Sequence, residues 1–369
     1  MKLIVGAGIT GCTIAEHISR FSNEEILLID RRSHIAGNIY DERIENIWIH
    51  RYGPHIFHTD NKDIWDYINR FGNFYPHIHK VRAIVDGIEI PLPFNLLSME
   101  KLFPANICQS YIQELEKYFP YGSRINIFEL AKIKTLKPLA SFIYEKIFEN
   151  YSAKQWNLSS GLEELDSSVS KRLPFIFGKT DCYFDDRFQG IPIDGYSTLC
   201  KNMIDHPSIK LELVTSHKDL DLSKFSQIFY CGGIDEFFDY KFGSLQYRGI
   251  KFDFSTLQTQ KFQNNSVINY PNNYAFTRIT EYKHFLPTYS NKTIISMEYP
   301  MNYQKGQNEQ CYPIPQKNQR QLYQSYVEYA KQYPNLYFCG RLGMYQYFDM
   351  DDAILEASRL CERLFGNKK

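Results

Sequence analysis

The pattern of apolar and polar positions at the two ends of the chain predicts a parallel sheet covered by helices. Near the start, an apolar strand leads into an amphipathic helix, and a second apolar strand follows over residues 25–30. The apolar residues of this helix are Ile14, Ala15, Ile18 and Phe21. Three later runs are also typical of strands: 209–214, 227–233 and 336–341. We therefore predict an α/β domain that is discontinuous in sequence.

The middle of the chain follows two other patterns. From about residue 99 to 150 the apolar spacing is helical, with short breaks, which predicts a small inserted helical subdomain. Residues 245–300 contain short aromatic and β-branched runs that predict an antiparallel sheet. The segment 47–59 mixes strand-forming residues with a Gly-Pro break, and we interpret it as a functional loop.

A G-x-G-x-x-G motif lies directly between the first strand and the first helix. Gly6 would make the tight turn, Gly8 would let a pyrophosphate approach the backbone, and Gly11 would let the helix pack closely on its strand. Asp30 ends the second strand, where a ribose hydroxyl needs an acceptor. These features predict a Rossmann-type dinucleotide-binding domain, but they do not distinguish NAD from FAD.

The C-terminal strand and helix favour FAD. A strand closed by Gly340 is followed by a helix that begins near Asp349, and large flavoenzymes commonly close the flavin site with such a segment. Asp349 is the expected N-cap, and Asp352 is its partner at the third helical position. The expected buried stripe consists of Ala353, Ile354, Ala357, Leu360 and Cys361. An ordinary capped C-terminal helix is the alternative.

Charge and cysteine usage narrow the class of protein. Forty-two basic and 42 acidic residues cancel, which argues against nucleic acid or a charged membrane surface as the main partner. No window is apolar enough to span a membrane, and the motif at the very start of the chain leads us to expect no signal peptide. The eight cysteines show neither C-x-x-C nor metal-ligand spacing, so we expect reduced thiols in the cytoplasm and no metal site.

Seven blocks of sequence, in order, resemble the UDP-galactopyranose mutase family, and the resemblance covers essentially the whole chain. The blocks are 5–8, 30–38, 50–59, 151–156, 187–192, 238–243 and 340–342. Ala36 departs from the pattern, because the family usually has glycine there. The resemblance implies a Rossmann-type FAD-binding domain over 1–72, 198–238 and 333–369. It also implies a helical subdomain with a mobile loop over 97–171, and an antiparallel β-sheet substrate domain over 73–96, 172–197 and 239–332.

The resemblance implies a flavin-dependent isomerase that interconverts UDP-galactopyranose and UDP-galactofuranose. Reduced FAD is the active form, its N5 attacks the anomeric carbon of the sugar, and UDP leaves and then returns. The implied partners are the nucleotide sugar and an external reductant for FAD. The implied setting is a cytoplasmic homodimer that supplies the furanose for cell-surface polysaccharides.

The resemblance also assigns roles to individual residues. Arg172 and Arg278 match the two arginines that hold the diphosphate, and His58 is a candidate proton carrier during ring opening. The implied substrate-binding residues are Tyr151, Trp156, Arg172, Tyr183, Asn269, Arg278, Tyr312, Tyr347 and Asp349. The implied cofactor-binding residues are Gly6, Gly8, Gly11, Asp30, Arg31, Gly37, Asn38, His55, Gly340, Arg341 and Met350. Taken singly, each of these residues also fits a role without function: an arginine can be a solvated surface residue, an aromatic residue part of the core, and a histidine a structural residue.

The residues leave three other functions open. A mutase acting on UDP-N-acetylgalactopyranose, alone or together with UDP-galactopyranose, would differ only near the sugar. An amine-oxidising or polyene-oxidising flavoenzyme would need an external electron acceptor and gives no reason for two arginines among tyrosines. A UDP-sugar-binding module would keep flavin only as structure. Isomerisation that appears on dithionite reduction would separate a mutase from the oxidising flavoenzyme and the binding module, but not one sugar specificity from the other.

Overall fold

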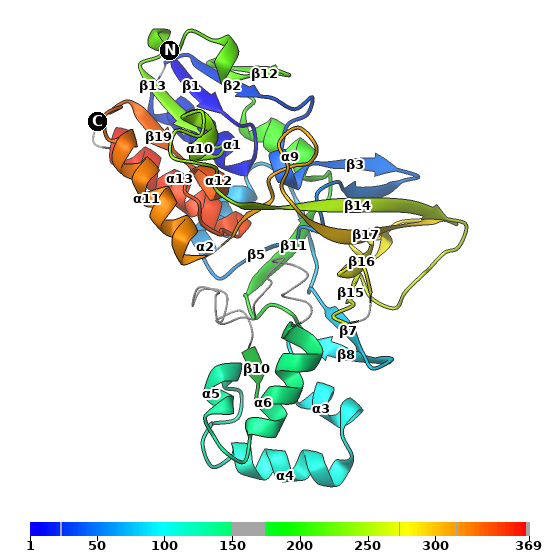
Figure 1. Ribbon diagram of the computed structural model, residues 1–369. Coiled ribbons are helices and arrows are strands. Elements are labelled where there is room, and N and C mark those ends of the chain that lie inside the picture. Colours follow the sequence, from blue (N-terminus) through cyan, green and yellow to red (C-terminus); the bar gives the residue numbers. More distant parts are fainter. Residues whose placement is uncertain (23, 150–173, 273, 315, 367–369) are drawn as a thin grey trace.

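In the computed structural model, which describes residues 1–22, 24–149, 174–272, 274–314 and 316–366, a parallel sheet holds the N-terminus (Figure 1). Its strands, in spatial order, are β12 (Ile209–Leu213), β2 (Ile26–Asp30), β1 (Lys2–Val5), β13 (Gln227–Tyr230) and β19 (Leu336–Phe338). All five residues of β2 are buried, as expected for a strand covered on both faces. The predicted discontinuous α/β domain is confirmed.

Four helices pack together on one side of this parallel sheet. They are α1 (Ile9–Phe21), α2 (Lys62–Ile68), α9 (Tyr196–Met203) and α13 (Met350–Phe365). Helix α1 lies against α13, so the two ends of the chain share one core. Of the stripe predicted for the last helix, Leu360 is only partly buried, while the other four residues are buried.

A second sheet, which we call the large sheet, extends away from the parallel sheet (Figure 1). Its order is β18 (Tyr312–Pro313), β14 (Tyr247–Leu257), β17 (Thr293–Asn302), β16 (Arg278–Glu281), β15 (Val267–Asn269), β7 (Val81–Val85) and β8 (Ile88–Leu92). The pairs are antiparallel, as predicted, except that β15 runs parallel to β7. This exception arises because the β7–β8 hairpin joins the sheet from an earlier part of the chain.

The predicted helical subdomain lies at the end of the molecule farthest from the two termini (Figure 1). It contains α3 (Leu96–Leu102), α4 (Ala105–Leu115), α5 (Ile127–Ala131), α6 (Lys137–Ile143) and the π-helix η2 (Tyr144–Glu149). Strand β9 (Arg124–Asn126) pairs there with β10 (Pro174–Ile176). The amide oxygen of Asn95 accepts a hydrogen bond from the Leu97 amide at 2.8 Å and so caps α3.

Shorter elements connect these parts. A small sheet is formed by β5 (Phe57–Thr59), β11 (Phe188–Pro192) and β6 (Phe74–Pro76), and a hairpin by β3 (Asp41–Ile44) and β4 (Ile47–His50). The short helices are η1 (Gly37–Ile39), η4 (His217–Asp219), η5 (Leu222–Lys224), α10 (Ile234–Phe237), η6 (Tyr282–His284) and α12 (Gly340–Gly343). Within the described residues, no helix is long and apolar enough to cross a bilayer.

The predicted domain boundaries stay a prediction. Helix α11 (Lys317–Ala330) falls within the range predicted for the β-sheet domain, yet it packs beside α10. Tyr326 of α11 lies against Phe238, and its hydroxyl donates to the Gly243 carbonyl oxygen at 2.6 Å. The described structure therefore places this helix next to the parallel-sheet end of the molecule (Figure 1).

Candidate functional site

A pocket lies at the carboxyl ends of the parallel strands, which is where open α/β sheets bind ligands. Its lining includes every residue predicted to bind the cofactor: Gly6, Gly8, Gly11, Asp30, Arg31, Gly37, Asn38, His55, Gly340, Arg341 and Met350. Asp349, predicted to bind substrate, also lines it. Residues from both ends of the chain are thus brought together, although their individual roles stay predictions.

The glycine turn leaves the start of α1 open to a phosphate group. A Cβ atom on Gly11 would lie 1.9 Å from the Gly6 carbonyl oxygen, so only glycine allows the helix to approach its strand this closely. Gly8 is the N-cap of α1, and in the described structure no side chain caps the helix. Unoccupied amide groups at a helix N-terminus are a ready binding site for a diphosphate, so this turn fits a dinucleotide such as FAD.

Asp30 lies in the pocket lining at the end of β2, where a ribose hydroxyl is predicted to bind. Its Oδ2 accepts a hydrogen bond from the Ala7 amide at 2.8 Å, and its Oδ1 accepts one from the Arg32 amide at 2.9 Å. These two bonds fix the buried carboxylate at the end of β2. Each carboxylate oxygen can accept a further hydrogen bond, so the group fits its predicted role toward a ribose hydroxyl.

Ala36, at the position where the family usually has glycine, has a left-handed backbone conformation that glycine adopts readily. Its φ angle is +74°, and its amide donates to the Ala7 carbonyl oxygen at 2.8 Å. A non-glycine residue in this left-handed region costs about 1 kcal/mol. The alanine is therefore accommodated in a conformation that glycine would adopt without this cost.

Arg341 lies close to two neighbouring tyrosines that were predicted to bind substrate, whose nearly parallel rings have centres 5.6 Å apart. Its guanidinium carbon is 4.6 Å from the ring centre of Tyr312 and 5.0 Å from that of Tyr347. The same side chain donates to the carbonyl oxygens of Phe348, at 2.6 Å, and Cys311, at 3.4 Å. The cation is thus held by π faces and carbonyl groups, which fixes its position at the wall of the pocket.

His55 connects the pocket to the large sheet. Its amide donates to Nδ1 of His50 at 2.9 Å, whereas its own Nδ1 is buried without a hydrogen-bond partner in the described structure. Burial, followed by the positive charges of Arg341 and Arg278, lowers the pKa of His55 from 6.5 to about 3. A neutral imidazole therefore lies near two arginines, one from each part of the site.

Three polar residues form a row across the large sheet, which we call the sheet row. Asn269 of β15 is opposite Arg278 of β16, which is opposite Glu298 of β17. Nε of Arg278 lies 2.6 Å from Oε2 of Glu298, whose side chain is 2% exposed. Burial raises the pKa of Glu298, and the Arg278 guanidinium partly offsets the rise. In the described structure, Oδ1 of Asn269 is buried without a partner.

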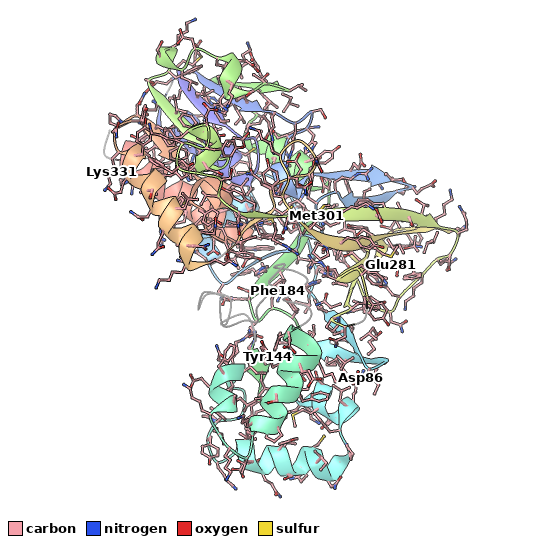
Figure 2. The ribbon with its side chains drawn as sticks, in the orientation of Figure 1. Asp86, Tyr144, Phe184, Glu281, Met301 and Lys331 are labelled. Carbon is pink, nitrogen blue, oxygen red and sulfur yellow. The ribbon has the colours of Figure 1, made fainter. Side chains whose placement is uncertain are left out.

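His58 and Tyr183 both contact the ring of Phe184 and form an aromatic cluster with it. Phe184 is labelled in Figure 2. The His58 ring stacks on Phe184 with centroids 3.6 Å apart, and its Nδ1 lies 3.0 Å from Oδ2 of Asp186. Tyr183 is edge-on to His79 at 5.7 Å. His58 is not part of the pocket lining formed by the described residues, so its predicted role as a proton carrier stays a prediction.

Three predicted substrate residues, Tyr151, Trp156 and Arg172, lie outside the described residues, as does most of the predicted mobile loop. The structure instead adds residues that sequence reasoning missed. Glu298 holds Arg278, and Asp186 pairs with His58 across 128 positions of sequence. His79 is a third missed residue, and its signal in the sequence is the short His-x-His pattern that it forms with His77. Burial, followed by the charge of His77, lowers the pKa of His79 well below the usual value.

Comparison with known proteins gives two family matches. A family model described as UDP-galactopyranose mutase matches residues 146–347, and one described as an NAD(P)-binding Rossmann-like domain matches residues 4–71. Among curated relatives, the dTDP-fucopyranose mutase of Escherichia coli is 35% identical, over 100% of this chain and 99% of the relative. The UDP-galactopyranose mutase of Mycoplasma pneumoniae is 32% identical, over 98% of this chain and 95% of the relative.

The crystal structure of a reduced UDP-galactopyranose mutase shares the fold. It superposes with a TM-score of 0.74 over 99% of this chain and 93% of that chain, at 12% sequence identity. This likeness agrees with the arrangement of a Rossmann-type domain, a helical region and an antiparallel sheet.

Proposed function

The chain belongs to the UDP-galactopyranose mutase family, and from this premise we propose that it interconverts UDP-galactopyranose and UDP-galactofuranose. It is a mutase-type isomerase, and its cofactor is FAD. The sugar and the nucleotide base that it accepts are the proposed part, because relatives of similar identity carry different substrate names.

The observation that carries the proposal is the pocket, which brings the glycine turn, Asp30, His55 and Arg341 together at the carboxyl ends of the parallel strands. The positive charges of Arg341 and of Arg278 both lower the pKa of His55, which supports a place for the sheet row near this pocket. Asp30 and Arg31 line the pocket at the end of β2, whereas Arg341 and Met350 line it from the C-terminal part of the chain. A dinucleotide held by the glycine turn, with its ribose at Asp30, would leave its flavin to the part of the lining that includes Arg341 and Met350.

Bound FAD in its reduced form supplies a nucleophilic ring nitrogen for the anomeric carbon of the sugar. The chain supplies the charge that holds the leaving diphosphate. Arg278 is oriented by Glu298, and the neighbouring rings of Tyr312 and Tyr347 both lie close to Arg341. These cations and hydroxyl groups would keep UDP in place while its bond to the sugar is broken and formed again.

His58 is proposed to move the proton that ring opening and closing require. Its Nδ1 faces the Asp186 carboxylate, which favours the tautomer with the proton on Nδ1. Nε2 is then the atom that exchanges a proton with the sugar hydroxyl. His55, in contrast, is held neutral by burial, so we assign it to packing and polar contact at the flavin rather than to proton transfer.

A second candidate substrate pair is dTDP-fucopyranose and dTDP-fucofuranose. The observation that favours it is the relative named dTDP-fucopyranose mutase, which aligns over the whole chain at 35% identity. Both reactions use the same leaving-group chemistry, since each substrate is a hexopyranose on a nucleoside diphosphate. UDP-N-acetylgalactopyranose differs from the first substrate only by its acetamido group and is the third pair to test.

We also propose that the enzyme works as a homodimer in the cytoplasm and provides furanose sugars for cell-surface polysaccharides. This setting rests on the family. It is supported by the balanced charge of the chain and by its eight cysteines, all of which lie in the described part and carry free thiols.

The test is an assay of the purified enzyme, with and without dithionite, on UDP-galactofuranose, dTDP-fucofuranose and the N-acetylated UDP-sugar. Reduced enzyme should convert UDP-galactofuranose to the pyranose, with kcat/KM about tenfold above that for the other two. Oxidised enzyme should be inactive. Equal rates in both redox states would overturn the role of the flavin, and a preference for dTDP-fucofuranose would overturn the substrate assignment.

A further inference from the structure

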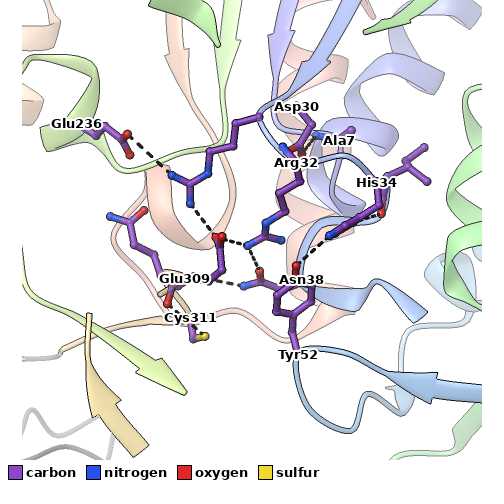
Figure 3. A network of polar contacts seen from close by, with 12 residues as sticks. Ala7, Asp30, Arg32, His34, Asn38, Tyr52, Glu236, Glu309 and Cys311 are labelled. Atoms are coloured by element: carbon purple, nitrogen blue, oxygen red, sulfur yellow. Dashed lines mark hydrogen bonds and ion pairs between the residues drawn. The ribbon is translucent and has the colours of Figure 1, made fainter. Parts of the chain in front are cut away.

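A single carboxylate joins two arginines at the ribose end of the pocket (Figure 3). Arg31 and Arg32 directly follow Asp30, and Glu309 lies in the loop between β17 and β18. Oε2 of Glu309 accepts from Nη2 of Arg31 at 2.8 Å and from Nη2 of Arg32 at 2.7 Å. The contact therefore joins segments about 280 positions apart, since Arg31 and Glu309 are separated by 278 residues.

Further contacts reinforce this connection. Nη2 of Arg32 also donates to Oδ1 of Asn38 at 2.9 Å, and Nδ2 of Asn38 donates to the Gln310 carbonyl oxygen at 3.4 Å. The Arg32 guanidinium lies over the Tyr52 ring at 4.5 Å. Arg32 is thus held on three sides, and its position does not depend on Glu309 alone.

The loop that carries Glu309 is held by its own hydrogen bonds. The Asn308 side chain accepts from the Gln304 amide at 2.7 Å and donates to the Asn302 carbonyl oxygen at 2.8 Å. After Glu309, the Cys311 amide donates to the Arg248 carbonyl oxygen at 2.7 Å. These bonds on both sides of Glu309 direct its carboxylate toward the arginines.

The two joined segments both contribute to the lining of the cofactor pocket. Arg31, Arg32 and Asn38 come from the segment that follows β2, and Gln310 comes from the loop between β17 and β18. Glu309 itself is not in the lining of the described pocket, but it contacts Arg31 and Arg32, which are. Its contacts join two parts of the lining beside Asp30, the residue that fits the ribose hydroxyls.

We propose that Glu309 is a latch residue that retains FAD by tying Arg31 and Arg32 to the loop between β17 and β18 at the adenosine end of the cofactor pocket. The two ion pairs are of modest strength because they are partly exposed to solvent: the side chain of Arg31 is 46% exposed, that of Arg32 13% and that of Glu309 35%. Release of a bound dinucleotide past this end requires them to part. The latch therefore slows dissociation, and it depends on the FAD site but not on which sugar the enzyme converts.

The test is the rate of FAD release from the holoenzyme of the wild type and Glu309→Gln, followed by flavin fluorescence at 0.1 M and 1 M NaCl. At the lower salt the variant should release FAD about 2- to 30-fold faster, the range expected for two partly exposed ion pairs. At 1 M NaCl, where the screening length is about 3 Å, the two rates should converge because the wild type accelerates.

Glu129→Gln is the matched control, because Glu129 makes an exposed ion pair with Lys132 in the helical subdomain, at 2.6 Å. It should release FAD at the wild-type rate at both salt concentrations. Equal release from Glu309→Gln and the wild type at 0.1 M NaCl would overturn the latch, as would a wild-type rate that does not change with salt. The salt dependence of the wild type tests the proposal even if the variant does not fold. No sugar substrate is present, so a wrong substrate assignment cannot produce these results.

Discussion

The dinucleotide pocket and the sheet row are two binding regions that are built differently, one mainly from backbone and the other from side chains. The pocket is shaped chiefly by backbone, through the glycine turn, the open end of α1 and the loop at Ala36. The sheet row instead uses buried polar side chains placed opposite one another, as Arg278 and Glu298 show. A backbone cradle suits a cofactor that stays bound, whereas side-chain charges suit a group that must be held, released and held again.

The comparison predicts that mutations separate into two classes. Changes in the glycine turn should reduce cofactor content, and with it everything that depends on the cofactor. Changes in the sheet row should reduce turnover while flavin per chain is preserved. Variants that mix the two effects would show that the regions are not independent.

The largest effect is expected for Gly11→Ala. The added Cβ would lie 1.9 Å from the Gly6 carbonyl oxygen, so α1 must move away from its strand, at a cost of about 3 kcal/mol in folding stability. The purified variant should contain little or no flavin by its visible absorbance. Gly178→Ala is the control, because its Cβ would meet neighbouring atoms only at 3.7 Å or more and the protein should stay yellow. Full flavin content in Gly11→Ala would contradict the backbone account.

The next largest effect is expected for Arg278→Ala. Loss of a charge-assisted contact to the diphosphate should lower kcat/KM by about 10- to 150-fold, with flavin per chain unchanged. Because the variant leaves Glu298 buried without this cation, its thermal stability should also fall. The double variant Arg278→Ala with Glu298→Gln should recover part of the stability but none of the activity. Recovery of activity would show that Arg278 does not contact the substrate.

Acid should destabilise the protein through its buried histidines. Burial lowers the pKa of His55 to about 3 and that of His77 to about 4, from 6.5. Below pH 6.5 the unfolded chain binds protons that the folded chain does not, so the free energy of unfolding should fall as the pH drops from 6.5 toward 4. His77→Gln should show a shallower decline of melting temperature over this range. An identical decline in the variant would mean that His77 does not resist protonation in the folded state.

The smallest effect is expected for Tyr347→Phe. The ring that packs against Arg341 is kept, and only the hydroxyl is lost, so kcat/KM should fall by about 2- to 12-fold, as for one hydrogen bond. Tyr289→Phe is the control, because Tyr289 is 99% exposed and should have no effect. A decrease in flavin content in Tyr347→Phe would assign this tyrosine to the cofactor rather than to the substrate.

Sequence patterns predicted those features that local periodicity determines. The strand, glycine turn, helix and terminal acid at the N-terminus were predicted from one continuous segment, and α13 with its cap at Asp349 from another. The resemblance to the family then brought in the distant residues that line the same pocket. Backbone-built sites are easier to predict because their motif is contiguous.

The rest depends on pairings that no local pattern contains. The parallel pairing of β15 with β7 requires knowledge of the path between them, and so does the contact of Glu309 with Arg32 across 277 positions. Glu298 has no recognisable motif; its importance follows only from the register that places it opposite Arg278. Buried polar pairs of this kind are determined by tertiary structure, and a single sequence does not reveal them.

The strand order of the parallel sheet has a consequence for how the protein is made. β1 lies at the centre of the sheet, yet its neighbour β13 and the edge strand β19 come from residues 227–230 and 336–338, and α13 is the last helix of the described chain. At a synthesis rate of 5 to 20 residues per second, about 15 to 70 s pass between the first strand and α13 emerging from a ribosome. During that time the glycine turn exists without the core that shapes it. FAD can therefore be captured only after β13, β19 and α13 have been synthesised.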